Sequence, residues 1–299
     1  MPLALKWWFQ PGSARRLGIS RCLFYLWYWL QFSYYHPGEF AGLPASLWQP
    51  VALVQGLGPP EPLWFSVLSC CAHPAFLLAS VGLWTRLATL VVAVAAAMPL
   101  AWMQCYGFPE FHMMPLVLIS WILPWSACAD AFSLDARLYP GPRLERHAGC
   151  YTWPIRLCWL TLVLPMASAG FHKLLGSWPT EPVATMEWFL RLKFVVHGEM
   201  KAQRPWALMA IPLNYPWMLA LMAWGTVIFE LGCPLALLDR PRFLRPLWIG
   251  GLFFMQLVLA VGLLTLKTFP WFGAYLFWIP WGKGQRIPWG EGADQDDGS

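Results

Sequence analysis

The chain has 299 residues, of which 58% are hydrophobic and only 12% are charged. Soluble domains carry about 25% charged residues, so this composition excludes an ordinary water-exposed surface and indicates that lipid surrounds much of the chain. The net charge of +5 comes from basic residues spread over short loops, without the basic, aromatic-rich stripe of nucleic-acid-binding proteins. The eight cysteines lie mostly in apolar runs without a CxxC pair, so we expect neither a disulfide framework nor a metal site.

Apolar stretches near the ~20 residues that cross a bilayer recur along the chain. They predict an all-α integral membrane protein, a polytopic helical bundle of about eight transmembrane helices within residues 17–282. Because the last stretch is short, seven spans are an alternative. The expected spans are 17–35, 63–83, 86–106, 111–129, 151–175, 215–238, 244–264 and 268–281.

The positions of Lys and Arg predict the orientation of these spans, because short, positively charged loops stay in the cytoplasm. Residues 1–16 are basic and have no signal-peptide cleavage site, which places the N-terminus inside. The later loops on the same side are also basic, and the acidic, glycine-rich segment 283–299 is expected to be a disordered cytoplasmic tail. We therefore expect both termini in the cytoplasm.

The long outer segment 176–214 contains an amphipathic stretch at 182–196. Its periodicity predicts an interfacial helix that could form a lid over a pocket opening outward. The apolar side chains expected on one face of this helix are Met186, Phe189, Leu190 and Phe194.

Ionisable side chains in spans cost a few kcal/mol on insertion scales and often mark function. Lys173 ends the fifth span and His112 begins the fourth, so these adjacent antiparallel helices could bring a lysine and an imidazole into one pocket. A desolvated lysine beside other cations loses its proton more readily and can act as a general base. The alternatives are a lysine that snorkels to the headgroups and a histidine bonded at the interface. Further ionisable residues expected at the outer end are Glu110, His172 and Lys267.

Two ionisable residues lie deeper, His73 in the second span and Glu230 in the sixth. His73 precedes a proline, and we expect it to bond a carbonyl that the proline frees. Glu230 has two interpretations: a protonated carboxyl that holds two helices together, or the partner of a buried cation. A transporter would place more such groups at the midplane of repeated halves, so this class is disfavoured. At the inner end of the fourth span, Ser133 and Asp135 are expected to cap or position the next segment.

Two blocks of sequence and a shorter pattern point to a known family. The first block runs from His112 to a Ser-x-Asp motif at 133–135, and the second, SAGFHKLLGSW, has an Ala-Gly-x-x-Lys-Leu pattern before Trp178. FELGCPLALL at 229–238 has a Glu-x-x-x-Pro pattern. Over residues 15–282 the chain resembles HTTM (horizontally transferred transmembrane) proteins, bacterial relatives of the membrane domain of vitamin K-dependent gamma-glutamyl carboxylase.

The resemblance implies an enzyme of a bacterial inner (plasma) membrane that is both an oxidoreductase and a lyase. Lys173 would be the catalytic base that deprotonates a vitamin K-type hydroquinone, so that reaction with oxygen can drive modification of a substrate on the outer side, such as gamma-carboxylation. The implied cofactor is a reduced naphthoquinone without a metal, and the implied partners are membrane lipid, the quinol and a secreted peptide or protein. His112 would act near the same pocket, which would also include His172, Glu110, Glu230 and Trp178.

A second hypothesis is a non-catalytic membrane partner for the maturation or export of a secreted peptide, as some HTTM relatives are thought to be. Tolerance of a neutral residue at position 173 would favour it. Because the chain ends at Ser299 without the large lumenal region of the animal carboxylase, we do not expect the propeptide recognition of that enzyme. The resemblance assigns no role to Gln256 or Lys267.

Overall fold

The computed structural model describes residues 7–34, 43–51, 54, 56, 58–107, 111–139, 148–195, 207–238, 243–262 and 266–281. Within these ranges the regular secondary structure is helical and no strand occurs, which confirms the expected all-α class. Glu110 and the tail 283–299 lie outside the described residues.

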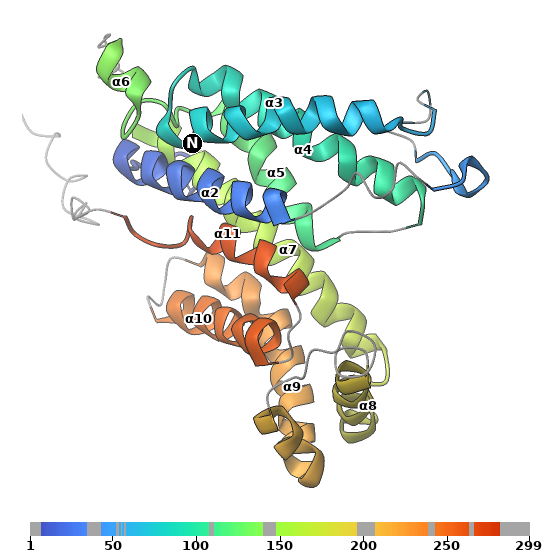
Figure 1. Ribbon diagram of the computed structural model, residues 1–299. Coiled ribbons are helices and arrows are strands. Elements are labelled where there is room, and N and C mark those ends of the chain that lie inside the picture. The colour runs from blue at the N-terminus through green and yellow to red at the C-terminus, as the bar shows by residue number, and fades with distance from the viewer. Residues whose placement is uncertain are drawn as a thin grey trace, which may run out of the picture.

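The N-terminal part is a layer of helices that pack in chain order (Figure 1). α2 (Ala14–Tyr34) packs against α3 (Pro62–Val81), α3 against α4 (Thr85–Cys105), and α4 against α5 (Met114–Ile122). Gly82 ends α3 with a φ of 73°, a left-handed conformation that residues with a Cβ rarely adopt. The short helix α6 (Leu134–Leu138) follows α5 along the chain.

His73 has a different partner from the one expected. The indole Nε1 of Trp29 donates a hydrogen bond of 2.9 Å to His73 Nδ1 and so joins α2 to α3. The ring of Phe32 packs edge-on against the same imidazole. A side chain from the neighbouring helix therefore bonds His73, where the sequence predicted a freed carbonyl.

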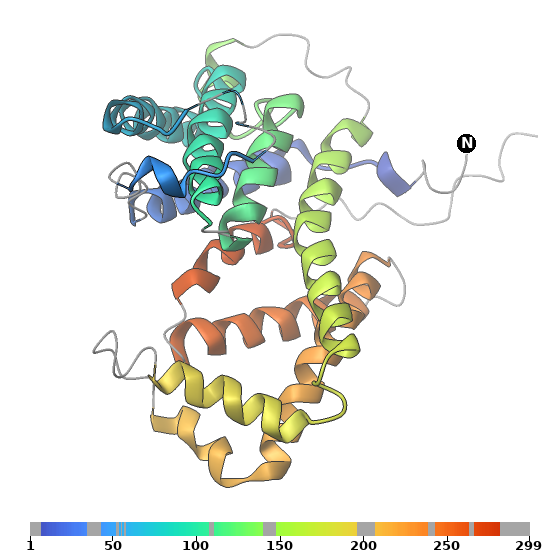
Figure 2. The same cartoon turned by 90° about the vertical axis from the view of Figure 1, so that its right-hand side faces the viewer.

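The longest helix, α7 (Thr152–Leu175), joins the N-terminal layer to the C-terminal helices (Figure 2). It contacts α5 on one side and α9 (Pro216–Gly232) on the other. α8 (Pro182–Phe194) packs on α9, and α10 (Leu244–Leu257) packs on the 3₁₀ turn that ends α9. These contacts make α7 the element that relates the two parts of the molecule.

After α10 the chain returns to the core. A π-helical turn (Val258–Gly262) follows α10, and a 3₁₀ turn (Leu266–Trp271) leads into α11 (Phe272–Tyr275). α11 contacts α2, α5 and α7, and its Tyr275 is buried. The C-terminal segment therefore closes the space between the N-terminal layer and α7.

Five helices of the described chain are long and apolar enough to cross a membrane. The fourth expected span is shorter, at Met114–Trp125, because the segment after Ile122 contains a proline and leaves the α-helix. The last expected span is a 3₁₀ turn followed by the four-residue α11. The five helices are Pro62–Val81, Thr85–Cys105, Gly149–Leu175, Pro216–Leu237 and Leu244–Val261.

Two described basic residues of the expected cytoplasmic side lie together at one end of the molecule. Arg16 of α2 and Arg245 of α10 both stack on Trp159 of α7, 5.7 and 4.6 Å from the ring centre. At the same end lies α6, whereas α8 lies at the far end (Figure 1). Large apolar side chains are exposed on the long helices, among them Leu90 of α4 and Leu221 of α9. Such exposed apolar side chains are compatible with a protein that lies in a membrane.

Candidate functional site

Lys173 lies in the last turn of α7, three residues after Gly170 and on the same helical face. Gly170 is buried, and a Cβ at this position would come within 2.8 Å of Glu230 Cβ and of the Leu231 nitrogen. The glycine therefore lets the backbones of α7 and α9 approach closely, as small residues do between membrane helices. This approach brings the last turn of α7 beside Glu230.

Lys173 and Glu230 form an ion pair in which Nζ lies 2.5 Å from Oε1. The side chain of Glu230 is 6% exposed and that of Lys173 is 24% exposed. The ammonium also lies 5.0 Å from the centre of the Trp178 ring, in the turn after α7. A carboxylate and an indole thus hold the ammonium, while part of the lysine side chain remains accessible.

The second carboxylate oxygen of Glu230 takes no part in this ion pair. Oε2 is buried and has no hydrogen-bond partner among the described residues. A buried acceptor without a donor is costly, and such groups in native proteins call for an explanation. Of the two interpretations of Glu230, the structure supports the partner of a cation and adds an acceptor that a ligand could use.

Helix α8 holds Trp178 in place. Met186 and Leu190 of α8 are buried against Leu219 and Ala223 of α9, and Trp178 packs against the same cluster. Of the apolar face expected for this helix, Met186 and Leu190 are buried, while Phe189 and Phe194 are half-buried. α8 therefore covers α9 next to the ion pair.

The two histidines of the expected pocket are not the partners of Lys173, whose ammonium contacts Glu230 and Trp178. His172 is exposed, and its ring contacts Phe171. His112 lies in a 3₁₀ turn at the start of α5, which packs against the turn Leu266–Trp271. The contacts of Lys173 are with Glu230 and Trp178, so the structure does not join the lysine to His112. The reason is that α9, and not the start of α5, supplies the polar partner at this end of α7.

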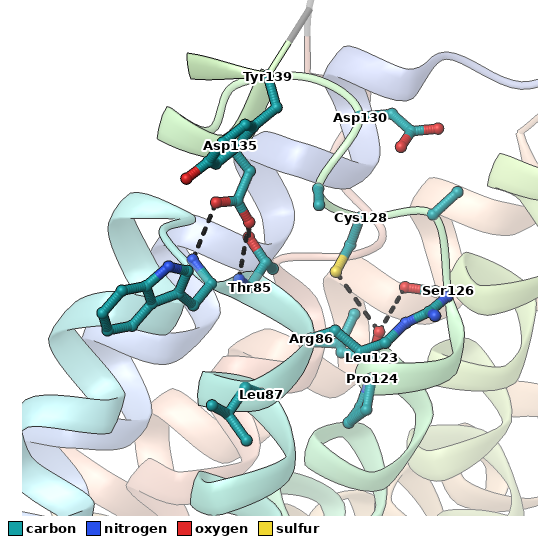
Figure 3. Close-up of a pocket in the computed structure, with 13 residues that line it drawn as sticks. Thr85, Arg86, Leu87, Leu123, Pro124, Ser126, Cys128, Asp130, Asp135 and Tyr139 are labelled. Carbon is teal, nitrogen blue, oxygen red and sulfur yellow. Dashed lines mark hydrogen bonds between the residues drawn. The ribbon is translucent and has the colours of Figure 1, made fainter. Parts of the chain in front are cut away.

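Ser133 and Asp135 organise the end of the molecule where α6 lies, and Figure 3 shows the Asp135 carboxylate beside the start of α4. Ser133 caps α6, because its Oγ accepts a hydrogen bond of 3.0 Å from the amide of Ala136. The Asp135 carboxylate accepts hydrogen bonds from the amides of Trp84 and Thr85, at 2.9 and 2.8 Å, and from the Thr85 hydroxyl at 2.7 Å. The Ser-x-Asp motif thus ties α6 to the first turn of α4.

The sequence analysis missed Arg21, which anchors this junction. Its guanidinium is fully buried and donates to the carbonyls of Ser80, Cys128 and Phe132, at 3.3, 3.1 and 2.7 Å. An arginine inside the apolar run ISRCLFYLW was a visible signal. Its partners are backbone carbonyls of distant segments, which no side-chain motif marks.

Two cavities lie away from the ion pair. One, of about 680 Å³, opens beside Asp135 and the start of α4. The other, of about 510 Å³, is an apolar groove between α2, α10 and the segment around α11. Lys173 lines neither of them. In the part of the chain that the structure describes, no three His, Cys, Asp or Glu side chains are grouped as metal ligands would be.

Comparisons with known proteins leave the chain without an assigned relative. No protein-family model matches it, and searches of the curated proteins and of the solved structures find no match. The HTTM resemblance therefore stays a prediction, and the function has to be argued from the residues around Lys173.

Proposed function

We propose that this chain is a membrane-embedded, carboxylase-like enzyme that removes a proton from a quinol at Lys173. It uses oxygen to drive modification, such as gamma-carboxylation, of a secreted peptide on the outer side. The observation that carries the proposal is the ion pair of Lys173 and Glu230, in which the lysine side chain is partly accessible and one carboxylate oxygen lacks a donor among the residues that the structure describes. The five long apolar helices support the membrane setting. Eight spans, cytoplasmic termini and a bacterial plasma membrane complete the proposal.

For Lys173 to act as a base, its proton must first leave the amine. Glu230 Oε1 is in position to accept it, because the two atoms share a hydrogen bond of 2.5 Å. The transfer converts an ammonium and a carboxylate into a neutral amine and a neutral acid. Burial of the Glu230 side chain favours this transfer, because burial penalises the charged carboxylate. The amine can then take the proton of a bound hydroxyl group.

The residues around the pair suit a reduced naphthoquinone. Such a quinol would supply an acidic hydroxyl group and the electrons for oxygen. Trp178 offers an aromatic face beside the Lys173 ammonium, and Glu230 Oε2 can accept a hydrogen bond from a hydroxyl. Once Lys173 is protonated again, its charge lies next to the oxygen that has lost the proton, which stabilises that negative charge.

One observation favours the second function, a non-catalytic partner for peptide maturation or export. The ion pair lies at the close contact of α7 and α9 around Gly170, so it could serve only to hold these helices together. In that case a permanent cation at position 173 would serve as well as lysine.

Lys173→Arg separates the two functions. Arginine keeps the positive charge and the ion pair, but it does not lose its proton in proteins. With a base at position 173, this variant should oxidise a naphthoquinol in the presence of oxygen at least about 100-fold more slowly than wild type. Arg191→Lys, in the exposed pair with Glu187 on α8, is the matched control and should keep the wild-type rate.

Oxygen consumption by the purified, folded proteins measures both variants. A wild-type rate in Lys173→Arg would refute the base. Absence of turnover in the wild type would favour the maturation partner, whose assay is secretion of the peptide in cells that carry Lys173→Arg.

A further inference from the structure

The apolar groove of about 510 Å³ lies between α2, α10 and the segment around α11. In Figure 1, α11 lies between the other two helices, and it contacts both of them. Large, exposed apolar side chains line the groove, among them Leu26 and Leu30 of α2, Phe253 and Leu257 of α10, and Ile279 after α11. The groove therefore opens to the surface of the molecule between apolar side chains.

The groove offers no charge and little polarity to a ligand. None of the side chains that line it is charged, and only those of Trp27 and Tyr275 carry a polar atom. The Nε1 of Trp27 donates a hydrogen bond of 3.2 Å to the carbonyl of Phe269, and the hydroxyl of Tyr275 is buried. A hydrocarbon chain needs no polar partner and therefore matches this lining.

One end of the groove lies beside the first turn of α2. Arg16 in that turn donates a hydrogen bond of 2.9 Å to the carbonyl of Phe277, which fixes the chain after α11 next to the start of α2. Ile279, which lines the groove, follows only two residues later. Arg15, the neighbour of Arg16, is therefore placed near the end of the groove on the expected cytoplasmic side.

Arg15 supplies a positive charge at this end. It is exposed, and its guanidinium makes no hydrogen bond or ion pair with the residues that the structure describes. Leu23, Leu26 and Leu30 follow it by close to two, three and four helical turns, so all four residues lie on one side of α2. At about 1.5 Å per residue, α2 rises about 12 Å from Arg15 to Leu23 and about 22 Å to Leu30, and one leaflet of hydrocarbon is about 15 Å thick. An acyl chain that starts at Arg15 therefore reaches the groove.

The arginine gives the groove a preference among lipids. The hydrocarbon of a membrane is as apolar as the groove, so the groove by itself does not distinguish one phospholipid from another. A guanidinium can bind two phosphate oxygens at once, and a basic residue at the cytoplasmic surface attracts anionic headgroups. The ligand that matches both features has a hydrocarbon chain and a headgroup with a net negative charge.

We infer that this groove holds one acyl chain of an anionic phospholipid from the inner leaflet, with the phosphate of the lipid at Arg15. The chain lies along Leu23 and Leu30 and against Phe253. The inference rests on the proposed membrane setting, but it does not depend on catalysis at Lys173, which does not line the groove.

Native mass spectrometry of the full chain in detergent tests the headgroup contact. Phosphatidylglycerol and phosphatidylcholine with identical acyl chains are titrated into wild type, Arg15→Gln and Arg137→Gln. Wild type should bind phosphatidylglycerol about 5-fold more tightly, which corresponds to about 1 kcal/mol for one basic residue. Arg15→Gln should lose most of this preference. Arg137→Gln is the matched control, because Arg137 is an exposed arginine on α6 that does not line the groove, and it should keep the preference.

A second pair of variants tests the chain contact. Leu30→Trp places a larger side chain in the groove and should weaken the binding of both lipids. Leu221→Trp on α9 is the control, because Leu221 is similarly exposed, at 66% against 57% for Leu30, and does not line the groove. It should leave binding unchanged. Circular dichroism of the same preparations confirms that each variant is folded.

Three results would overturn the site. Equal binding of the two lipids to wild type would remove the preference for an anionic headgroup. An unchanged preference in folded Arg15→Gln would place the headgroup at another basic residue, and unchanged binding in folded Leu30→Trp would place the chain outside the groove. Wild type should also stay in the membrane during alkaline extraction, and its release would remove the premise of a lipid site. The quinol assay tests Lys173 separately, so its failure would leave this site standing.

Discussion

Arg21 and Lys173 are both cations on apolar helices, but their surroundings differ. Arg21 is fully buried, and three backbone carbonyls from separate segments accept its hydrogen bonds. Lys173 is 24% exposed and has one carboxylate, whose other oxygen lacks a donor among the described residues. The Arg21 charge is held by three acceptors, although its Nε is a buried donor without an acceptor among the described residues, whereas the Lys173 charge has one carboxylate and a partly accessible side chain.

This difference separates a charge that organises the fold from one that can act on a ligand. A cation with several fixed acceptors contributes to stability and cannot exchange partners without unfolding its surroundings. A cation with one acceptor can transfer a proton or bind another anion at a modest cost in free energy. Variants at Arg21 should therefore lower mainly the stability, whereas variants at Lys173 should lower mainly the activity.

The largest effect on stability is expected for Arg21→Met. The variant leaves the carbonyls of Ser80, Cys128 and Phe132 without their donors, and hydrogen bonds to a charged group contribute about 1.5–3 kcal/mol each. Relief of the buried charge offsets part of this loss, so we expect a decrease of about 3 kcal/mol or more in the free energy of unfolding. Tryptophan fluorescence during denaturation in detergent micelles measures it.

Arg15→Met is the matched control, because Arg15 is exposed at the start of the same helix. It should change stability little. If the two variants were equally stable, the three carbonyl bonds would not be what holds this end of the molecule together.

A smaller effect is expected for Gly170→Ala, which acts on the second site. The new Cβ would lie 2.8 Å from Glu230 Cβ and from the Leu231 nitrogen, so α7 and α9 would have to separate. Overpacking of this kind costs about 1–3 kcal/mol. The separation also lengthens the contact of Lys173 with Glu230. We therefore expect the rate of quinol oxidation to fall by a larger factor than the equilibrium constant for folding.

Gly225→Ala on α9 provides the control, since nothing lies within 4 Å of a Cβ built there. In a helix this change is expected to be neutral or to stabilise by about 0.5–1 kcal/mol. Equal behaviour of the two alanine variants would show that the close approach at Gly170 does not limit the site.

The sequence was sufficient to predict the helices that come from long apolar runs. The expected spans 63–83 and 151–175 differ from α3 and α7 by no more than two residues at either end. It overestimated the fourth span, because hydropathy continues through Pro124 although the helix does not. Hydropathy thus locates apolar chain but is less sensitive to where its backbone hydrogen bonds stop.

The candidate site was predicted in its residues but not in its contacts. Lys173, Glu230 and Trp178 were each singled out, yet the expected neighbour of the lysine was His112. Which side chains meet depends on the rotation of α7 and α9 about their axes, and this depends on the contact at Gly170. The spacing of ionisable residues along the chain does not reveal how the helices are rotated. For the same reason, the sequence could not predict the partners of Arg21.

The smallest effect on stability, and the sharpest contrast with Arg21, is expected for Lys173→Met/Glu230→Met. Replacing both members of a buried ion pair with apolar residues is often neutral or stabilising, whereas removing one member leaves an unpaired charge. The double variant should unfold within about 1 kcal/mol of wild type, and each single variant should be less stable than the double. Quinol oxidation should be lost in all three, because none retains both the amine and its proton acceptor. Denaturation and oxygen consumption of the same preparations give both quantities. If the double variant were as unstable as Arg21→Met, the ion pair would stabilise the fold in the way that Arg21 does. The physical basis for a ligand site at the end of α7 would then be lost.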